Sequence, residues 1–234
     1  MGIDATLRAI EHVEGWMSDA QARRLWAAAS QLSAPARIVE IGSFQGRSTI
    51  VLATAAPDGV EVVAIDPHAG NDRGPQEISG YEAEAASDNQ RFEQNLRDAG
   101  VRERVRHVRA FSDRAHTEVD GPIDLLYIDG AHRYAPARED IVSWGRRVVA
   151  GGTMLIHDSF SSIGVTLAIL RTLVPSSEWT YIGRSGSMTE YRRLPPIGRA
   201  SNAGRQAAQL PWFAKNVVLK VLIASKILKR DWPY

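Results

Sequence analysis

The sequence contains no cysteine among its 234 residues. Disulfide bridges, thiolate-ligated metal sites and cysteine nucleophiles are therefore excluded, and this composition fits a reducing compartment. Residues 1–16 also lack the basic start and the apolar core that an export signal needs. We therefore expect a cytoplasmic protein.

Aromatic residues are scarce, at 7%, and no uninterrupted apolar run of about 20 residues, the length of a membrane span, is present. Low-complexity tracts and repeats are also absent. A hydrophobic content of 44% is ordinary for a globular chain, and this length supplies one substantial core. We expect a helical cap over 1–34, one catalytic domain over 35–195, and a linker with a basic amphipathic helix over 196–234.

The net charge of +1 hides an uneven distribution. Residues 211–234 carry five basic residues and one acid, a net charge of +4, which leaves 23 basic and 26 acidic residues, or −3, for the rest. Because no basic stripe runs through the predicted body, we expect no nucleic-acid partner. The tail reads as a helix that is apolar around most of its circumference. Two interpretations stay open: it packs on its own domain or on a twin subunit in a homodimer, or it attaches to a membrane surface through Trp212, Phe213 and Trp232.

Short β-branched runs alternate with longer helical patterns along the chain. The strand-like runs cover 37–41, 60–65, 105–110, 123–129 and 153–158, and the helical segments cover 4–13, 19–32, 46–56, 87–99, 136–148 and 163–174. Nearly continuous apolar runs are typical of strands that are covered on both faces. Two last runs, 179–183 and 187–194, flank a short turn that favours an antiparallel hairpin. We predict a Rossmann-like, doubly wound α/β fold with a mostly parallel seven-stranded sheet and a C-terminal antiparallel hairpin.

The first run leads into the loop E-I-G-S-F-Q-G (40–46), which opens a helix. Its glycines follow G-x-x-x-G rather than the dinucleotide fingerprint, and an acid at Glu40 would repel a pyrophosphate but suit an ammonium or sulfonium group. The second run ends in Asp66, where a carboxylate can accept hydrogen bonds from two ribose hydroxyls. S-adenosylmethionine carries all of these groups, so the pattern indicates this cofactor.

Five segments resemble the class I S-adenosylmethionine-dependent methyltransferases, namely 39–49, 64–67, 92–101, 124–134 and 149–160. The resemblance spans roughly 35–195. Within this class, the chain resembles in particular the small-molecule and sugar O-methyltransferases, including those of methylmannose polysaccharides. It implies a set of cofactor contacts, with the methionine end first, then the ribose and the adenine: Glu40, Gly42, Ser43, Phe44, Ser48, Asp66, Phe111, Ser112 and Asp129.

Acids and histidines follow the fourth and fifth runs. Asp129 and His132 come after one, and His157 and Asp158 close the other. Because the carboxyl ends of parallel strands meet at one edge, we expect these side chains to lie together and to offer Mg²⁺ or a similar cation the ligands Asp129, His157 and Asp158. The resembled branch often carries two adjacent acids where this chain has His157 and Asp158.

Methyl transfer to a hydroxyl requires positioning and the removal of a proton. A cation lowers the pKa of a hydroxyl that it binds, and an imidazole accepts a proton near neutral pH. We expect His132 as the base, with His157 as the second candidate. The predicted activity is O-methylation of a sugar or another polyhydroxylated small molecule, or of an oligosaccharide. The alternatives are a catechol or phenolic O-methyltransferase and a non-catalytic cofactor-binding assembly protein.

The connection 67–89 is longer than most strand-to-helix links. It is either a lid over the acceptor or a surface excursion, and its place above the strand ends favours the lid. His68 and Tyr81 would then touch the substrate.

Overall fold

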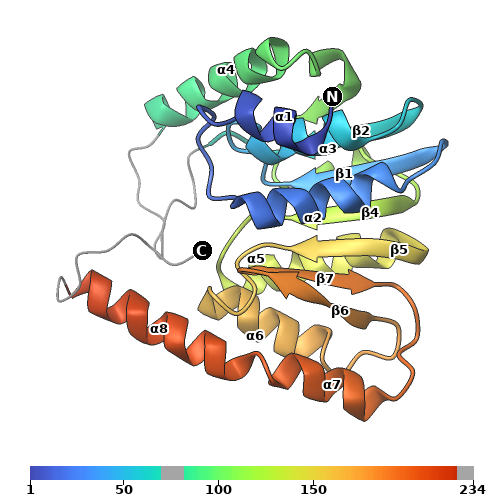
Figure 1. Ribbon diagram of the computed structural model, residues 1–234, viewed down its shortest axis with the longest axis vertical. Helices are drawn as coiled ribbons and strands as arrows, with labels where there is room; N and C mark the ends of the chain where they lie inside the picture. The colour runs from blue at the N-terminus through green and yellow to red at the C-terminus, as the bar shows by residue number, and fades with distance from the viewer. Residues whose placement is uncertain (70–81, 226–234) are drawn as a thin grey trace.

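The computed structural model describes residues 1–69 and 82–225. The described strands form one sheet in the order β3-β2-β1-β4-β5-β7-β6 (Figure 1). Its members are β1 Ala36–Ile41, β2 Val60–Ile65, β3 Val105–Val108, β4 Ile123–Ile128, β5 Val148–Ile156, β6 Thr180–Ser185 and β7 Met188–Arg192. β1 to β5 pair in parallel, whereas β7 is antiparallel to both β5 and β6. The predicted seven-stranded fold with its C-terminal hairpin is confirmed.

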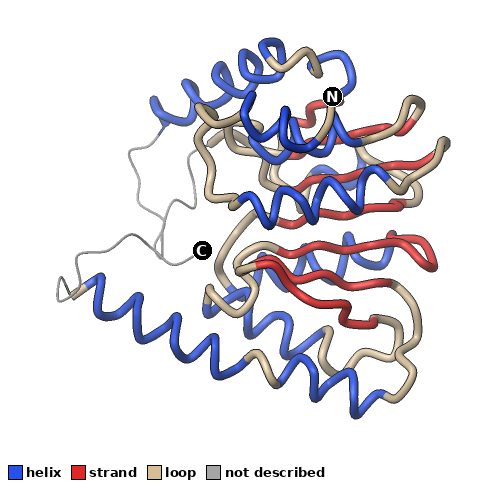
Figure 2. The backbone as a smooth tube through the Cα atoms, in the orientation of Figure 1, coloured by secondary structure: helices blue, strands red, loops and turns tan. Residues whose placement is uncertain are grey.

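Helices cover both faces of the sheet (Figure 2). One face carries α1 Ile3–Ala9, α2 Asp19–Ser30, α3 Arg47–Ala55 and α4 Glu82–Asp98, and the other carries α5 Tyr134–Glu139 and α6 Ile163–Thr172. A π-helical turn, Asp140–Trp144, continues α5 toward β5 through the 3-10 turn Gly145–Arg147. Two more 3-10 turns flank β3, at Arg102–Arg104 and Ala115–Thr117. After the hairpin come α7 Arg199–Ala207 and α8 Leu210–Ala224.

Alternate residues of the central strands enter two different cores. In β1, Ile38 packs in the cluster that holds Leu25 and Phe92, whereas Val39 packs in the cluster that holds Trp144. All five of these side chains are fully buried. This two-sided burial is the reason the strand sequences are continuously apolar instead of alternating.

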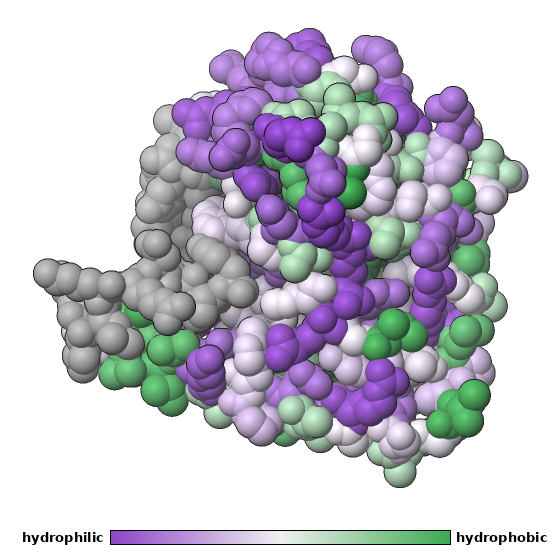
Figure 3. All heavy atoms as spheres, viewed as in Figure 1, coloured by the Kyte–Doolittle hydropathy of each residue, from purple (hydrophilic) through white to green (hydrophobic). Residues whose placement is uncertain are grey.

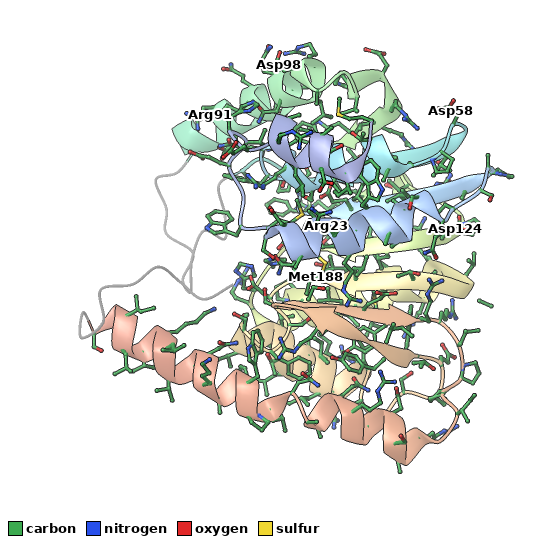
Figure 4. All side chains as sticks on the ribbon, viewed as in Figure 1. Arg23, Asp58, Arg91, Asp98, Asp124 and Met188 are labelled. Atoms are coloured by element: carbon green, nitrogen blue, oxygen red, sulfur yellow. The ribbon has the colours of Figure 1, made fainter. Side chains whose placement is uncertain are left out.

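The N-terminal cap is tied to both the sheet and the hairpin. Ser18 opens α2 with the predicted capping box, in which its hydroxyl accepts from the backbone N–H of Gln21 and its own N–H donates to the Gln21 side chain. The Gln21 amide also donates to Ser187 Oγ at 3.1 Å. Met188, the first residue of β7, is fully buried beneath this helix (Figure 4).

α7 occupies a stretch that the sequence pattern assigned to a linker. Its buried side is polar: Asn202 accepts the backbone N–H of Tyr181 at 2.9 Å and donates to the carbonyl of Trp179 at 3.1 Å. Trp212 and Phe213, which one of the two interpretations placed at a membrane surface, pack against the core of their own domain. Trp232 lies outside the described residues. Within 1–69 and 82–225, no helix has both the length and the apolar content needed to cross a membrane.

Candidate active site

The loop after β1 passes very close to the end of β4. Gly42 has a φ of 85°, and a Cβ at this position would lie 2.2 Å from the carbonyl oxygen of Asp129. Its N–H donates to the carbonyl of Ile65 at 2.8 Å, while the N–H of Asp129 donates to Ile41 at 2.8 Å. The loop therefore connects the carboxyl ends of β2 and β4, and only glycine fits at Gly42.

Asp66 lies at the end of β2 and is fixed by the backbone on both of its oxygens. The N–H of Phe44 donates to Oδ2 at 2.8 Å, and the N–H of His68 donates to Oδ1 at 2.7 Å. Trp16, in the cap, packs on the Phe44 ring with centroids 5.3 Å apart. A carboxylate has about four acceptor positions, so Asp66 keeps capacity for ribose hydroxyls while its orientation is set by the loops.

Glu40 does not face the open edge of the sheet. Its side chain is fully buried behind the loop, where it accepts hydrogen bonds from Ser48 and from Thr49, the latter at 2.5 Å. Burial raises the pKa of Glu40 to about 8, against the opposing effect of these two hydroxyl donors. Glu40 and Ser48 thus hold the first turn of α3, and their expected contact with the cofactor stays a prediction.

The expected adenine end lies after β3. The Phe111 side chain is 40% exposed, and Ser112 Oγ donates to Asp140 Oδ1 at 2.6 Å. Burial raises the pKa of Asp140 to about 7, although the Ser112 hydrogen bond acts in the other direction. Ser43, in the β1 loop, is buried, and its hydroxyl has no hydrogen-bond partner among the described residues. A ligand atom that accepts or donates there would satisfy it.

Two acids and two histidines converge after β4 and β5, at the same edge. His132 Nε2 lies 2.8 Å from Asp158 Oδ2, and His157 Nδ1 lies 3.1 Å from Asp129 Oδ1 and 3.7 Å from Asp158 Oδ2. The Tyr127 hydroxyl donates to Asp129 Oδ2 at 2.9 Å. The sequence analysis gave Tyr127 no role, although its place two residues before Asp129 puts both on one face of the strand.

The acids and histidines of this cluster shift one another's pKa values. Burial disfavours the charged form of His157, but the carboxylates of Asp129 and Asp158 outweigh it and hold the pKa of this imidazole well above its usual range. Burial likewise opposes ionisation of Asp158, yet hydrogen bonds from His132 and His157 hold the pKa of its carboxyl well below normal. His157 is therefore buried beside two carboxylates that favour its protonated form.

Three side chains at this edge could hold a metal ion, and they differ from the expected ligands by one residue. Ligand atoms of Asp129, His132 and Asp158 lie within 4.8 Å of one another and are partly exposed. His157, expected among the ligands, is buried beside Asp129 instead. Two carboxylate oxygens with one imidazole nitrogen suit Mg²⁺ or Mn²⁺, so the donor chemistry of the edge fits a divalent cation.

The N-terminal turn of α6 sets the position of His132. Ser162 Oγ donates to the carbonyl of His132 at 3.1 Å, and a Cβ at Gly164 would lie 2.2 Å from the same oxygen. His132 is 40% exposed, so it borders the open edge. Of the two residues expected to touch substrate from the 67–89 connection, His68 is buried beside Asp66, and Tyr81 lies outside the described residues.

The sheet order, the glycine loop after β1 and the strand-end Asp66 together define a class I methyltransferase. A family model described as a methyltransferase domain matches residues 39–159. The match covers more than half of the chain, which therefore belongs to this methyltransferase family and is an S-adenosylmethionine-dependent enzyme.

Solved structures with the same fold are similar over most of the chain. Cofactor-bound Rv0187 from MTB is 23% identical with a TM-score of 0.57, over 83% of this chain and 90% of that one. The O-methyltransferase TomG from Streptomyces achromogenes, in complex with SAM, is 20% identical with a TM-score of 0.56, over 83% and 89%. An O-methyltransferase from Bacillus cereus, in complex with SAH, is 18% identical with a TM-score of 0.55, over 82% and 90%.

Proposed function

We propose that this enzyme transfers the methyl group of S-adenosylmethionine to a hydroxyl oxygen of a sugar or another polyhydroxylated small molecule, with the help of Mg²⁺ or a similar cation. The observation that carries the proposal is the convergence of Asp129, His132 and Asp158 at the edge where the cofactor loop ends. The O-methyltransferases among the similar structures support oxygen as the acceptor atom.

In this proposal the cofactor lies across the carboxyl ends of β1 to β4. The backbone of the β1 loop approaches the methionine end, Asp66 accepts the ribose hydroxyls, and Phe111 with Ser112 borders the adenine. The Phe44 and His68 N–H groups hold the Asp66 carboxylate in place before the cofactor arrives. This preorganisation lowers the cost of ordering the site on binding.

Asp129 and Asp158 would hold the cation, which would lower the pKa of an acceptor hydroxyl bound to it. His132 then accepts the hydroxyl proton, while its contact with Asp158 orients the imidazole. His157 is buried and keeps the two carboxylates in place. A ring nitrogen of His132 is also close enough to serve as a third ligand, and the roles of base and ligand predict different responses to added metal.

The acceptor must lie at the open edge. The cavity beside Asp129, His132 and His157 has a volume of about 10 Å³, which is the size of a single water.

Two exposed aromatic side chains are compatible with a phenolic acceptor. Trp16, which packs on Phe44, is 54% exposed, and Tyr134, two residues after His132, is 41% exposed. Aromatic faces of this kind pack against phenol rings and sugar rings alike.

The experiment is methyl transfer from isotope-labelled S-adenosylmethionine to a panel of monosaccharides, oligosaccharides, polyols and catechols, with product masses measured. We expect labelled methyl ethers of polyhydroxylated acceptors, lost in excess chelator and restored by Mg²⁺. Methyl transfer to catechols alone would show that the acceptor is a phenol and not a polyhydroxylated compound. Undiminished transfer in chelator would remove the cation from the proposal.

A further inference from the structure

The C-terminal half of α8 carries aliphatic side chains that the described part of the chain leaves partly or largely exposed. Over 217–223 the helix carries six large aliphatic side chains, of which Val218 and Val221 are exposed and the others half-buried: Val217, Val218, Leu219, Val221, Leu222 and Ile223. Val218 is 56% and Val221 is 60% exposed. At 100° per residue these side chains surround the helix except along the stripe that Asn216 shares with Lys220. A helix that is apolar on so many sides needs a partner.

The first half of α8, in contrast, is firmly docked. Asn216 is buried and donates to the carbonyl of Phe160 at 3.2 Å, two residues after Asp158. The Arg184 guanidinium lies 4.0 Å from the centroid of the Trp212 ring, which itself packs on the core. The apolar half is therefore held in a fixed place relative to the active-site edge.

The exposed half also projects on the functional side of the molecule. α8 runs past the carboxyl ends of the parallel strands, the edge that carries Asp129 and Asp158 (Figure 1). Figure 3 shows hydrophobic side chains gathered at this end of the helix. Whatever covers this surface lies close to the side from which an acceptor would enter.

Charge identifies the kind of partner. Residues 211–234 carry a net charge of +4 in the sequence, whereas the rest of the chain carries −3. Lys215 lies one turn before Val218 and Leu219, on the exposed side of the helix. Two copies paired through this segment would bring like charges together, while an anionic lipid surface complements both the lysines and the aliphatic side chains.

We propose that the C-terminal half of α8 docks on an anionic phospholipid bilayer and holds the carboxyl edge of the sheet close to that surface. The helix lies in the interface with its aliphatic side chains among the lipid chains and its lysines at the headgroups. This docking does not depend on the acceptor proposed above.

The test is co-sedimentation of the full chain with vesicles. We expect binding to vesicles of phosphatidylcholine with one quarter phosphatidylglycerol to exceed binding to pure phosphatidylcholine by about tenfold or more, and to weaken as salt is raised. The double variant Val218→Glu with Val221→Glu should lose about tenfold or more of that binding. The control is Leu194→Glu with Ile197→Glu, which adds the same charge at exposed positions after β7.

Thermal unfolding of both double variants checks that each is folded, since all four side chains are exposed. Light scattering adds an independent measurement of mass. Equal binding of the control and the α8 variant, or no preference for anionic vesicles, would overturn the proposal. So would a wild-type dimer that the α8 variant converts to a monomer, because a second copy would then be the partner.

Discussion

In the proposed mechanism, different residues at the carboxyl edge hold the cofactor and carry out the chemistry. Asp66 is fixed by two backbone N–H groups beside the cofactor loop, whereas Asp158 is paired with the exposed His132. We therefore predict different effects for the two carboxylates. Loss of Asp66 should weaken cofactor binding, whereas loss of the Asp158 and His132 pair should lower turnover.

Asp66→Ala should weaken S-adenosylmethionine binding, because the ribose loses a charged hydrogen-bond acceptor worth about 1.5 to 3 kcal/mol. Calorimetric titration of the purified chain measures this. Asp58→Ala is the matched control, since Asp58 is fully exposed at the amino-terminal end of β2, away from the site (Figure 4). If the two variants bind the cofactor equally well, Asp66 does not hold the ribose.

His132→Gln should lower kcat by about 10²- to 10⁴-fold with little change in cofactor affinity, because a general base acts in the transition state. Added Mg²⁺ should not restore this variant but should partly restore Asp158→Asn, in which the proposed cation ligand loses its negative charge. Steady-state rates at several Mg²⁺ concentrations separate these roles. Recovery of His132→Gln in high Mg²⁺ would make His132 a ligand instead.

Asp140 should make stability depend on pH. Because its pKa is raised from 3.8 to about 7, the folded state binds an extra proton between these values, and the free energy of unfolding falls as pH rises through this window. Asp140→Asn stays neutral and can still accept from Ser112. The free energy of unfolding of this variant, relative to that of the wild type, should therefore rise by up to about 1.4 kcal/mol per pH unit between pH 5 and 7.

Urea unfolding of both proteins at pH 5, 6 and 8 measures this difference, and all other titrating groups are common to the pair. Parallel pH profiles for the wild type and Asp140→Asn would show that Asp140 ionises normally. The outcome bears on the proposed adenine side of the site, where Asp140 accepts a hydrogen bond from Ser112.

The sequence identified the members of the acid and histidine cluster but not their arrangement. His157 continues the ladder by donating its N–H to Ile128, whereas Asp158 turns the chain with a φ of 53°. A left-handed aspartate leaves no clear mark in a sequence, so adjacent residues could not be assigned to a buried and an open position. The turn places His132, and not the buried His157, with Asp129 and Asp158 in the group of side chains that could hold a metal ion.

At the scale of elements, α6 controls the catalytic edge through one close contact. Gly164→Ala would place a methyl group 2.2 Å from the His132 carbonyl, so the His132 segment must move. We expect kcat to fall well below that of the wild type while cofactor affinity is kept, because the β1 loop is not touched. Gly204→Ala in α7 is the control, since nothing lies within 4 Å of a Cβ there.

Gly204→Ala should leave activity unchanged and stabilise the fold by about 0.5 to 1 kcal/mol, the usual gain of alanine over glycine inside a helix. Initial rates and calorimetric unfolding of the two variants give both quantities. Equal activity of Gly164→Ala and the wild type would mean that His132 tolerates displacement and is not the base.

Strands and capped helices were predictable from the sequence, and α7 was not. β2 matches its predicted bounds, 60–65, because its apolar run is continuous, and α2 starts where the Ser18 capping box indicates. α7 lacks an apolar stripe, since its buried side relies on the hydrogen bonds of Asn202 and Gln206. Periodicity of apolar residues cannot detect a helix that is held by polar contacts.

At the scale of the whole molecule, one edge of the sheet gathers every proposed role. The cofactor loop, the cluster of acids and histidines and the projecting half of α8 lie on the side where the parallel strands end (Figure 1). The opposite edge is closed by contacts such as that from the Arg37 N–H to Asp124, at 2.8 Å. This separation is what the general rule for open α/β sheets predicts.

The most direct test of the central claim, that this edge is a cation-assisted methyl-transfer centre, is a crystal structure with S-adenosylhomocysteine and Mn²⁺. We expect the ribose hydroxyls on Asp66 and an anomalous Mn²⁺ peak within ligand distance of Asp129 and Asp158, next to the vacated methyl position. A cofactor bound with its sulfur away from His132, or Mn²⁺ absent from both carboxylates at saturating concentration, would contradict the account.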